Sequence, residues 1–482
     1  PISAQFVDTA ISALEYNYAP VNLIPASKHF QFKVFPLSTV VQINTHNPYG
    51  WNDGLMIPAK GYQQHVSGGF FLRAGPLSIQ VKPEFIYAAN PPYLDTNDQI
   101  ASNGYSYYIA GGYGADLPAY HETKNFSALD MGQSSLRINV GPASFGVSKE
   151  NLWWGPGRRN SLLMSNSARG FKHLTLNTTR PITSPIGSFE GQIVSGRLEN
   201  SNSPLNTNKN QEWRYLSGMV IDYQPKWISG LFVGLTRVFQ IYNSDIQGFS
   251  DYFPLFQPFE KRRTEEDSKI RDQLTSVFAR YIFRGSGAEV YAELGRNDHS
   301  FNTRDFLQEP GHSRAYIVGF QKLVTLPSSD ENILVAAEIT QLSQSINRLV
   351  RSSGTWYVHE INQGYTNSGE VIGAGTGPGG NLQSLEISWL KGFKKIGLQL
   401  ERIEHNRDFY EEMIDLNGSY DGQWVDLSAG LVASWDYQNF LFRGQLSGIQ
   451  SLNYIWQTRK INLPQRHVFN FHANVGLNYY FK

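Results

Sequence analysis

The residues with the most distinctive chemistry lie in one short segment, Ser148 to Asn160, which reads Ser-Lys-Glu-Asn-Leu-Trp-Trp-Gly-Pro-Gly-Arg-Arg-Asn. The apolar face of a sugar ring stacks on indole, and guanidinium groups hold hydroxyls or carboxylates with paired hydrogen bonds. The segment therefore indicates a carbohydrate site, with candidate contacts Trp153, Trp154, Arg158, Arg159 and Asn160. The alternative is that the paired tryptophans belong to a membrane girdle or pack in the interior.

Composition excludes several other chemistries. The chain has no cysteine, so disulfides, thiolate metal sites and cysteine nucleophiles are ruled out. Its 41 basic and 41 acidic residues cancel, which argues against a general attraction to nucleic acid. The eleven histidines show no close ligand spacing, so we expect no metal and no cofactor. Ser, His and acidic residues occur, but in no spacing that specifies a nucleophile and its base, so we expect no catalytic residues.

The elements that must position the candidate residues are β-strands. In the last segment, 467–481, Phe469, Phe471, Val475 and Leu477 share one parity, while the other parity is mostly polar. Strand side chains point alternately to opposite faces, so one face meets an apolar medium and the other a wet one. An aromatic-rich terminal strand, 13% aromatic residues and 44 glycines are typical of an outer-membrane β-barrel.

Turn signals set the expected number of strands. Eight short turns separate alternating segments, near 75–76, 141–142, 184–187, 225–230, 284–287, 326–332, 391–395 and 436–439. Longer polar stretches join the hairpins, and this asymmetry places the short turns on the periplasmic side. With an opening strand near 29–35 and the closing strand at 467–481, the sequence predicts an all-β, antiparallel transmembrane barrel of about eighteen strands. By the same parity, we expect Trp435 in the aromatic belt on the periplasmic side and Trp424 facing the lumen or a loop.

The predicted division of the chain is an N-terminal segment, 1–65, with the first strand and a plug-like or cap-like region, followed by the barrel, 66–482. Residues 37–65 are rich in Gly, Pro and Asn without a clear period, so we expect them to fill or cap a plugged lumen. Charged groups are costly on the lipid side of a wall strand. A polar network in the lumen is therefore predicted from His173, Glu190, Arg197, Glu199, Trp51 and Asp53, with sugar contact as the alternative role.

Several motifs resemble the Wzi family of capsule assembly proteins. They are Glu150 to Gly157, Asn160 to Ser165, Gly170 to His173, Ile186 to Gln192 and Gly196 to Glu199, and His46 to Gly61 is similar to the Bacteroidota branch. The resemblance is specific over roughly 44–200. It implies an eighteen-stranded outer-membrane barrel that acts as a lectin for capsular or surface polysaccharide, without catalysis. The periplasmic helical bundle of enterobacterial members has no clear counterpart in this sequence.

The leading hypothesis is therefore a lectin-like barrel of the bacterial outer membrane that binds or tethers capsular polysaccharide or exopolysaccharide, with its loops at the cell surface. Expected partners are that polysaccharide, outer-membrane lipid or lipopolysaccharide, the barrel assembly machinery during biogenesis, and an unidentified outer-membrane lipoprotein. The alternative is a diffusion channel or polysaccharide exporter, because eighteen strands can leave an aqueous lumen. An outer-membrane hydrolase is the third hypothesis.

Overall fold

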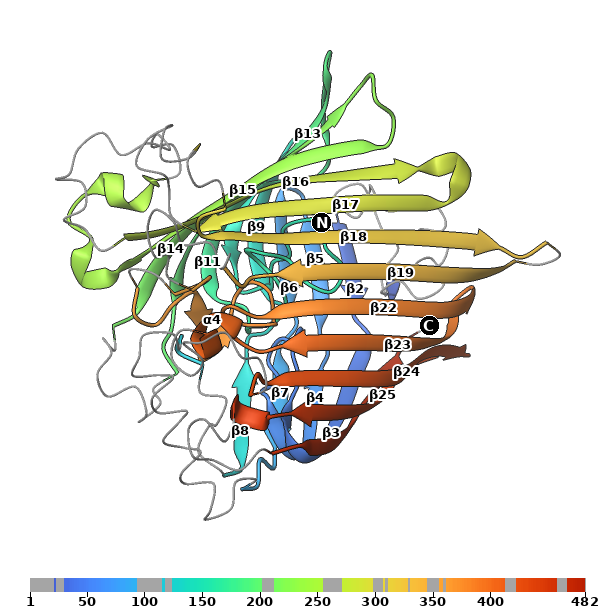
Figure 1. The fold of residues 1–482 in the computed structure, drawn as a ribbon. Coiled ribbons are helices and arrows are strands. Elements are labelled where there is room, and N and C mark those ends of the chain that lie inside the picture. The colour runs from blue at the N-terminus through green and yellow to red at the C-terminus, as the bar shows by residue number, and fades with distance from the viewer. Residues whose placement is uncertain are drawn as a thin grey trace.

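A computed structural model describes residues 21–22, 30–92, 115–117, 124–201, 212–254, 271–297, 307, 311–327, 330–344, 355–358, 361–411, 422–456 and 466–481. These residues form one large antiparallel sheet of twenty-four strands and a separate two-stranded sheet. The last strand of the large sheet, β26 (Val468–Tyr479), pairs with β3 (Leu37–Tyr49), so the sheet returns to its own beginning (Figure 1). Closure pairs the first and last wall strands with each other, and this removes the open ends that a membrane-spanning sheet cannot expose to lipid.

Each complete crossing of the barrel wall is called here a stave. Several of the early staves are interrupted, so that each consists of two strands in line. β2 (Phe30–Val34) continues into β3, and the same holds for four more pairs: β4 (Ala59–Ser67) with β5 (Phe70–Ala74), β6 (Leu77–Val81) with β7 (Glu84–Ala88), β8 (Phe126–Asp130) with β9 (Ser135–Val140), and β11 (Lys172–Thr178) with β12 (Ile182–Ser184). The short β1 (Val21–Asn22) pairs only with β2. With these strands joined, the described residues form eighteen staves, as the sequence predicts.

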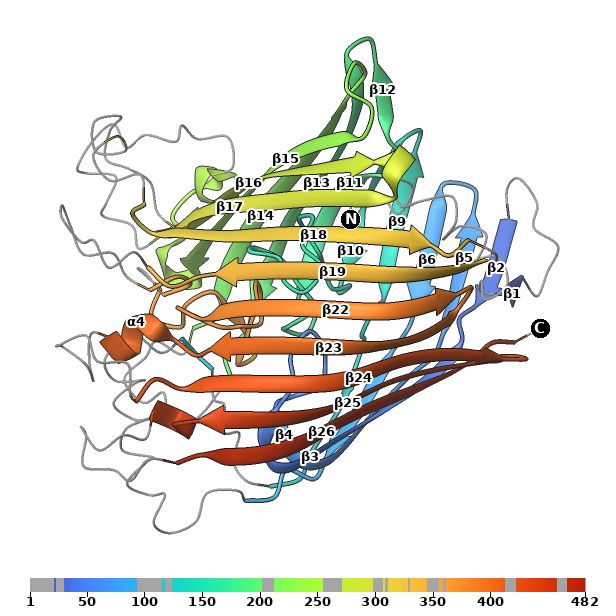
Figure 2. The same ribbon diagram turned by 45° about the vertical axis from the view of Figure 1, so that its right-hand side comes forward.

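The remaining staves are single strands. Besides β26, they are β10 (Ala143–Ser148), β13 (Gly187–Leu198), β14 (Arg214–Pro225), β15 (Leu231–Tyr242), β16 (Arg271–Phe283), β17 (Ala288–Asn297), β18 (Arg314–Thr325), β19 (Glu331–Gln341), β22 (Asn381–Lys391), β23 (Lys394–Glu404), β24 (Val425–Tyr437) and β25 (Phe440–Leu452). The strands from β17 to β19 and from β22 to β26 cross the front of the barrel in Figure 2.

The other elements are small. β20 (Thr366–Asn367) and β21 (Glu370–Val371) pair only with each other. The helical turns are η4 (Asn243–Asp245), η5 (Phe249–Tyr252), η8 (Arg284–Ser286), α4 (Arg407–Phe409) and η10 (Tyr454–Trp456). No helix in the described part of the chain is long and apolar enough to cross a membrane.

All eight predicted short turns join paired strands at one end of the barrel, called here the short-turn end; the opposite end is the long-loop end (Figure 1). The predicted alternation is confirmed on the strands. On β26, Phe469 and Phe471 are exposed on the outer face, whereas Asn470 and His472 are buried in the lumen. Trp435 also faces outward, and the Lys394 ammonium lies 4.9 Å from the centre of its ring. The exposed apolar rows form the belt that contacts lipid.

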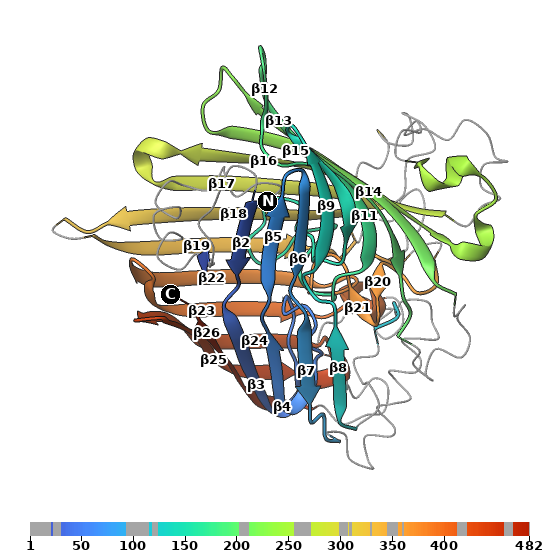
Figure 3. The same ribbon diagram turned by 180° about the vertical axis from the view of Figure 1, so that it is seen from behind.

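One expectation about the N-terminal segment is wrong. Residues 37–49 and 59–65 do not fill or cap the lumen, because they belong to β3 and β4, which pair with each other and with β26 and β7. The expected boundary at residue 65 therefore falls inside a wall strand. Only 50–58 leave the wall here. Figure 3 shows these early strands from behind. Residues 1–20 and 23–29 lie outside the described residues.

The wall strands also show why one glycine is needed. A Cβ at Gly319 would lie 2.1 Å from Cζ of Tyr291, whose ring packs across β18 in the lumen. We expect Gly319→Ala to displace this ring and to cost about 1–3 kcal/mol of stability, as overpacking typically does. The measurement is the temperature at which the purified barrel loses its compact band in heat-modifiability electrophoresis.

The matched control is Gly444→Ala, because a Cβ there would approach only Asn474 O, at 3.9 Å. An equal effect of the two substitutions would contradict the role given to Gly319.

Candidate functional site

The segment with the distinctive chemistry leaves the wall after β10, runs through the lumen as residues 149–171 and rejoins the wall at β11. Its central attachment is the carboxylate of Glu338, on the inner face of β19. That carboxylate accepts hydrogen bonds from the backbone N–H groups of Arg158 at 2.6 Å, Arg159 at 3.0 Å and Asn160 at 2.9 Å. Three successive N–H groups form a concave anion site, so Glu338 fixes this loop to the wall.

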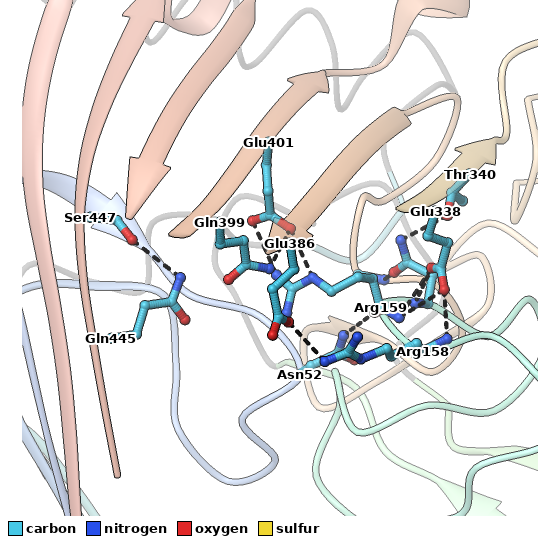
Figure 4. A network of polar contacts seen from close by, with 12 residues as sticks. Asn52, Arg158, Arg159, Glu338, Thr340, Glu386, Gln399, Glu401, Gln445 and Ser447 are labelled. Carbon is cyan, nitrogen blue, oxygen red and sulfur yellow. Dashed lines mark hydrogen bonds and ion pairs between the residues drawn. The ribbon is translucent and has the colours of Figure 1, made fainter. Parts of the chain in front are cut away.

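The two guanidinium groups of the segment are also bound to wall carboxylates (Figure 4). Nη2 of Arg158 lies 2.8 Å from Glu386, and Arg159 binds Glu401 through Nε at 2.8 Å and Nη2 at 3.1 Å. Partly buried charge-assisted pairs of this kind are among the stronger hydrogen bonds in proteins. Both arginines therefore position the loop.

The aromatic and amide members of the predicted site have different surroundings. Trp154 is 1% exposed and donates its indole N–H to Gln192 at 3.0 Å. Asn160 is fully buried and binds Thr340 and the backbone N–H of Gly375. Trp153 is half-buried and borders a polar chamber of about 580 Å³ at the short-turn end. Direct sugar contact by Trp154 and Asn160 is excluded by their burial, and the interior-packing alternative holds for both.

A second inward segment, 355–380, packs against the first. The Tyr357 hydroxyl donates to Leu162 O at 2.5 Å and accepts from Ala374 N at 2.7 Å. Arg214, on β14, donates to the carbonyls of Gly364 at 2.6 Å and Thr366 at 2.8 Å. The two segments bury an apolar core inside the barrel, which includes Trp154, Leu162, Leu163, Met164, Trp356, Tyr357, Tyr365 and Ile372. This core packs against the inner faces of β13 to β18, mostly toward their long-loop ends.

The third inward segment is residues 50–58. The Asn52 amide donates to Arg159 O at 2.5 Å and accepts from the Ser167 hydroxyl at 3.0 Å. The ring of Trp51 lies between two neighbours. The Arg159 guanidinium carbon is 4.6 Å from its centre, and a Cβ at Gly375 would lie 2.7 Å from the same ring. Trp51 is therefore held in place by a cation–π contact and by close packing on a glycine.

The predicted polar network of six residues is only partly brought together. Trp51 and Asp53 lie in the inward segment 50–58, and His173 and Glu190 are buried on the inner faces of β11 and β13. Arg197 and Glu199 are not in the lumen. They form an exposed pair at 2.7 Å, and the Arg197 guanidinium lies 4.9 Å from the centre of the Trp213 ring. The three inward segments together are called here the plug. The wall carboxylates that hold it, Glu338, Glu386 and Glu401, were not predicted.

An aromatic pocket at the long-loop end was also not predicted. It has a volume of about 220 Å³, and its walls include Trp424, Tyr454, Trp456 and His405. The His405 ring stacks on Trp424 at 3.7 Å, and its Nε2 lies 2.8 Å from Asp426 Oδ2, while Trp424 donates its indole N–H to Asp426 Oδ1 at 2.9 Å. Trp424 faces the lumen, as its parity predicts. Asp426 therefore fixes both rings.

Two buried carboxyl groups lie on the inward segments. Burial raises the pKa of Asp53 to about 7, and its Oδ1 has no hydrogen-bond partner among the described residues. Burial, followed by the nearby charge of Asp53, also raises the pKa of Glu370. In the described ranges, no group of three or more His, Asp or Glu side chains is placed to hold a metal ion.

Comparison with known proteins gives one family and a set of barrels. Residues 60–437 match the family model described as "Capsule assembly protein Wzi". The fold is similar to Wzi of Escherichia coli, an outer-membrane protein described as a carbohydrate-binding β-barrel involved in group 1 capsule assembly. The TM-score is 0.62 and the identity 12%, over 92% of this chain and 85% of that one. OccK7 of Pseudomonas aeruginosa gives a TM-score of 0.44 at 9% identity, over 94% of this chain and 98% of that one. OccK8 of the same organism gives a TM-score of 0.42 at 9% identity, over 92% of this chain and 97% of that one. No curated protein sequence matches the chain.

The attachment of the plug by Glu338 is testable. Glu338→Ala removes the acceptor of three backbone N–H groups and of the Tyr291 hydroxyl, which donates at 2.7 Å. Hydrogen bonds to a charged group contribute about 1.5–3 kcal/mol each, so we expect the loop to loosen. Trypsin should then cleave after Arg158 or Arg159 at least about tenfold faster, and planar-bilayer current should rise.

The control is Glu199→Ala, which removes a solvent-exposed carboxylate that pairs with Arg197, whereas only the backbone of Glu199 contacts the plug, at Asn367 and Ser368. If the Glu338 variant resisted trypsin as the parent does, the attachment assigned to this residue would be wrong.

Asp53 predicts a pH-dependent stability. At pH 5 the unfolded chain ionises Asp53, whose ordinary pKa is 3.8, while the folded chain keeps the proton up to a pKa of about 7. The folded state therefore loses stability as the pH rises from about 4 to about 7. Asp53→Asn should raise the unfolding temperature more at pH 8 than at pH 5. If Asp53→Asn raised the unfolding temperature by the same amount at both pH values, the raised pKa assigned to Asp53 would be wrong.

Proposed function

Because the chain belongs to the capsule assembly protein Wzi family and forms a barrel of the bacterial outer membrane, we propose that it binds and tethers capsular or other surface polysaccharide without catalysing a reaction. The long-loop end faces the cell surface in this proposal, since outer-membrane barrels keep their short turns in the periplasm. Its partners are the polysaccharide, the surrounding lipid or lipopolysaccharide and, during biogenesis, the barrel assembly machinery.

The observation that carries the proposal is the aromatic pocket at the long-loop end. The partly exposed indole of Trp424 offers an apolar face to a sugar ring, while Tyr454 and Trp456 are only 2% and 4% exposed and support it from behind. Asp426, Asn406, Thr376 and Glu370 border the same space with polar groups. Trp424 is the central ring because Tyr454 and Trp456 each meet it edge-on at 5.1 Å. A rigid aromatic wall with hydrogen-bonding groups beside it is the chemistry that a saccharide site requires.

The proposal changes the role of the segment first singled out. Arg158, Arg159, Trp154 and Asn160 support the outer site indirectly, since they hold the plug on which it rests. Trp153 borders the polar chamber at the other end of the barrel and keeps a candidate role in sugar contact there.

The channel alternative has less support. A porin lumen is a polar, water-filled passage, whereas this lumen holds a packed apolar core.

We expect Trp424→Ala to weaken binding of the cognate glycan by on the order of tenfold, since the variant loses the central stacking surface. The measurement is a glycan array on the detergent-purified parent, followed by calorimetric titration of the best ligand into parent and variant. Trp227→Ala is the matched control, because Trp227 is 72% exposed in a short turn at the opposite end.

Heat-modifiability of both variants shows that the barrels have assembled. Equal affinity of the Trp424 variant and the parent would remove the outer pocket as the site. If the parent bound no glycan on the array and a deletion strain kept all its surface polysaccharide, the tether itself would be refuted.

A further inference from the structure

A further cavity at the short-turn end, separate from the polar chamber beside Trp153, lies on the side of the plug opposite the aromatic pocket. Its volume is about 710 Å³, and it is bordered by the inner faces of β22 to β26 and β3 near the short turns. Toward the long-loop end it is bounded by Tyr49 to Asp53 and by Arg159. This cavity, called here the short-turn chamber, is a recess that the inward segment 50–58 closes at its inner end.

Two rows of side chains cross the wall of the short-turn chamber. Gln445 lies opposite Asn474, and Asn474 lies opposite Gln42, so three amides stand side by side on β25, β26 and β3. One step nearer the short turns, Lys395 lies opposite Ser434, Ser434 opposite Arg443, and Arg443 opposite Gly476. Directly opposed residues of an antiparallel sheet are about 5 Å apart, so each row forms a continuous polar strip.

Arg443 differs from the other inward cations of this region. Arg158 and Lys395 share Glu386, at 2.8 and 2.6 Å, and Arg159 is bound by Glu401. No acidic side chain within the described ranges forms an ion pair with Arg443, which lines the chamber and is exposed. The glycine opposite it on β26 leaves the space beside the guanidinium without a side chain. Arg443 therefore presents its donor fork to the chamber.

The acidic group nearest the inner end of the chamber does not oppose this charge strongly. Asp53 lines the chamber, and burial raises the pKa of its carboxyl to about 7, so near neutral pH a large share of it is protonated. Its Oδ1 has no protein partner among the described residues.

We infer that the short-turn chamber is a second glycan site, which takes a carboxylate-bearing sugar of an acidic saccharide from the short-turn end. The guanidinium of Arg443 holds the carboxylate with a paired hydrogen bond, and the amide row of Gln445, Asn474 and Gln42 meets the ring hydroxyls. The inference goes beyond the proposed function, because it places a binding site on the side of the plug opposite the aromatic pocket and does not require the outer site to bind.

A sugar acid fits the chamber better than a small inorganic anion. The volume is several times that of one ion, and the amide row offers both donors and acceptors, which an anion alone does not use. A neutral saccharide would leave the Arg443 guanidinium without a charged partner. The expected order of affinity is therefore acidic oligosaccharide first, then neutral oligosaccharide and phosphate.

The absence of cysteine allows a position-specific test. Ser434→Cys places a thiol in the chamber between Lys395 and Arg443. In the purified full chain, the labelling rate of this thiol is measured with and without trigalacturonate as the probe. Maltotriose and inorganic phosphate serve as comparison probes. We expect saturable protection by trigalacturonate, weaker at high salt, and little protection by the other two.

Arg443→Gln, in the Ser434→Cys background, should raise the trigalacturonate concentration for half-protection at least about tenfold. Arg73→Gln is the matched control, because Arg73 is an exposed arginine at the same end that borders the other chamber. It should leave protection unchanged. Compact, heat-modifiable bands confirm that each variant is folded.

Trp424→Ala, also in the Ser434→Cys background, separates this inference from the proposed function. Unchanged protection in this variant supports a site of its own in the chamber. Protection that disappears with Trp424 but persists in the Arg443 variant overturns the inference and leaves the outer site standing. Absence of protection at millimolar trigalacturonate, or equal protection by phosphate, also overturns it.

Discussion

The carboxylate of Glu338 is the interaction on which the interior of this barrel depends. It stands on a wall strand and accepts the backbone N–H groups of three consecutive plug residues, together with the Tyr291 hydroxyl. A buried carboxylate is costly unless its lone pairs are satisfied, and a loop that crosses the lumen must find partners for its own N–H groups. The loop N–H groups satisfy the lone pairs of the Glu338 carboxylate, and the carboxylate in turn gives those N–H groups an acceptor. The same hydrogen bonds place Arg158 within reach of Glu386 and Arg159 within reach of Glu401.

The plug is built in the manner of a soluble protein inside a membrane protein. Three inward segments, 50–58, 149–171 and 355–380, contribute to it, and the latter two form an apolar core with the wall. The outer surface of the same strands is apolar because lipid surrounds it. The wall is therefore apolar outside and mixed inside, with charged residues where the plug is attached and apolar residues where it packs. This arrangement divides the interior into separate cavities at the two ends.

The barrel could be predicted from the sequence because its signals are local. Turn residues and period-two alternation depend on neighbours in the chain, and the eight turns, the closing strand and the facing of Trp424 and Trp435 follow from them. The assignment of 37–65 failed because β3 and β4 carry Gly, Pro and Asn at their ends and an amide row on the inner face, which hides the alternation.

The site could not be predicted to the same extent, since its contacts join residues far apart in the sequence. Glu338 and Asn160 are separated by 178 residues, and no local pattern distinguishes a wall carboxylate that holds a loop from one that faces water. Trp154 resembles a sugar-stacking residue in sequence, yet it is 1% exposed because the second inward segment and the wall cover it. Arg197 has the charge expected of a lumen residue and lies at the exposed end of its strand, where solvation costs little.

Trp51 borders both the aromatic pocket and the short-turn chamber, and Tyr49 and Gly50 do the same. The two cavities thus share a wall one indole thick, held by Arg159 on one side and Gly375 on the other. A ligand on either side that displaced this ring would therefore change the wall of the other cavity as well. Thermodynamic linkage then requires the effect to be reciprocal: whatever factor an outer ligand applies to affinity on the inner side, an inner ligand applies to the outer side. The plug is in this sense a partition, and one indole ring contributes to the shape of the binding space on both of its sides.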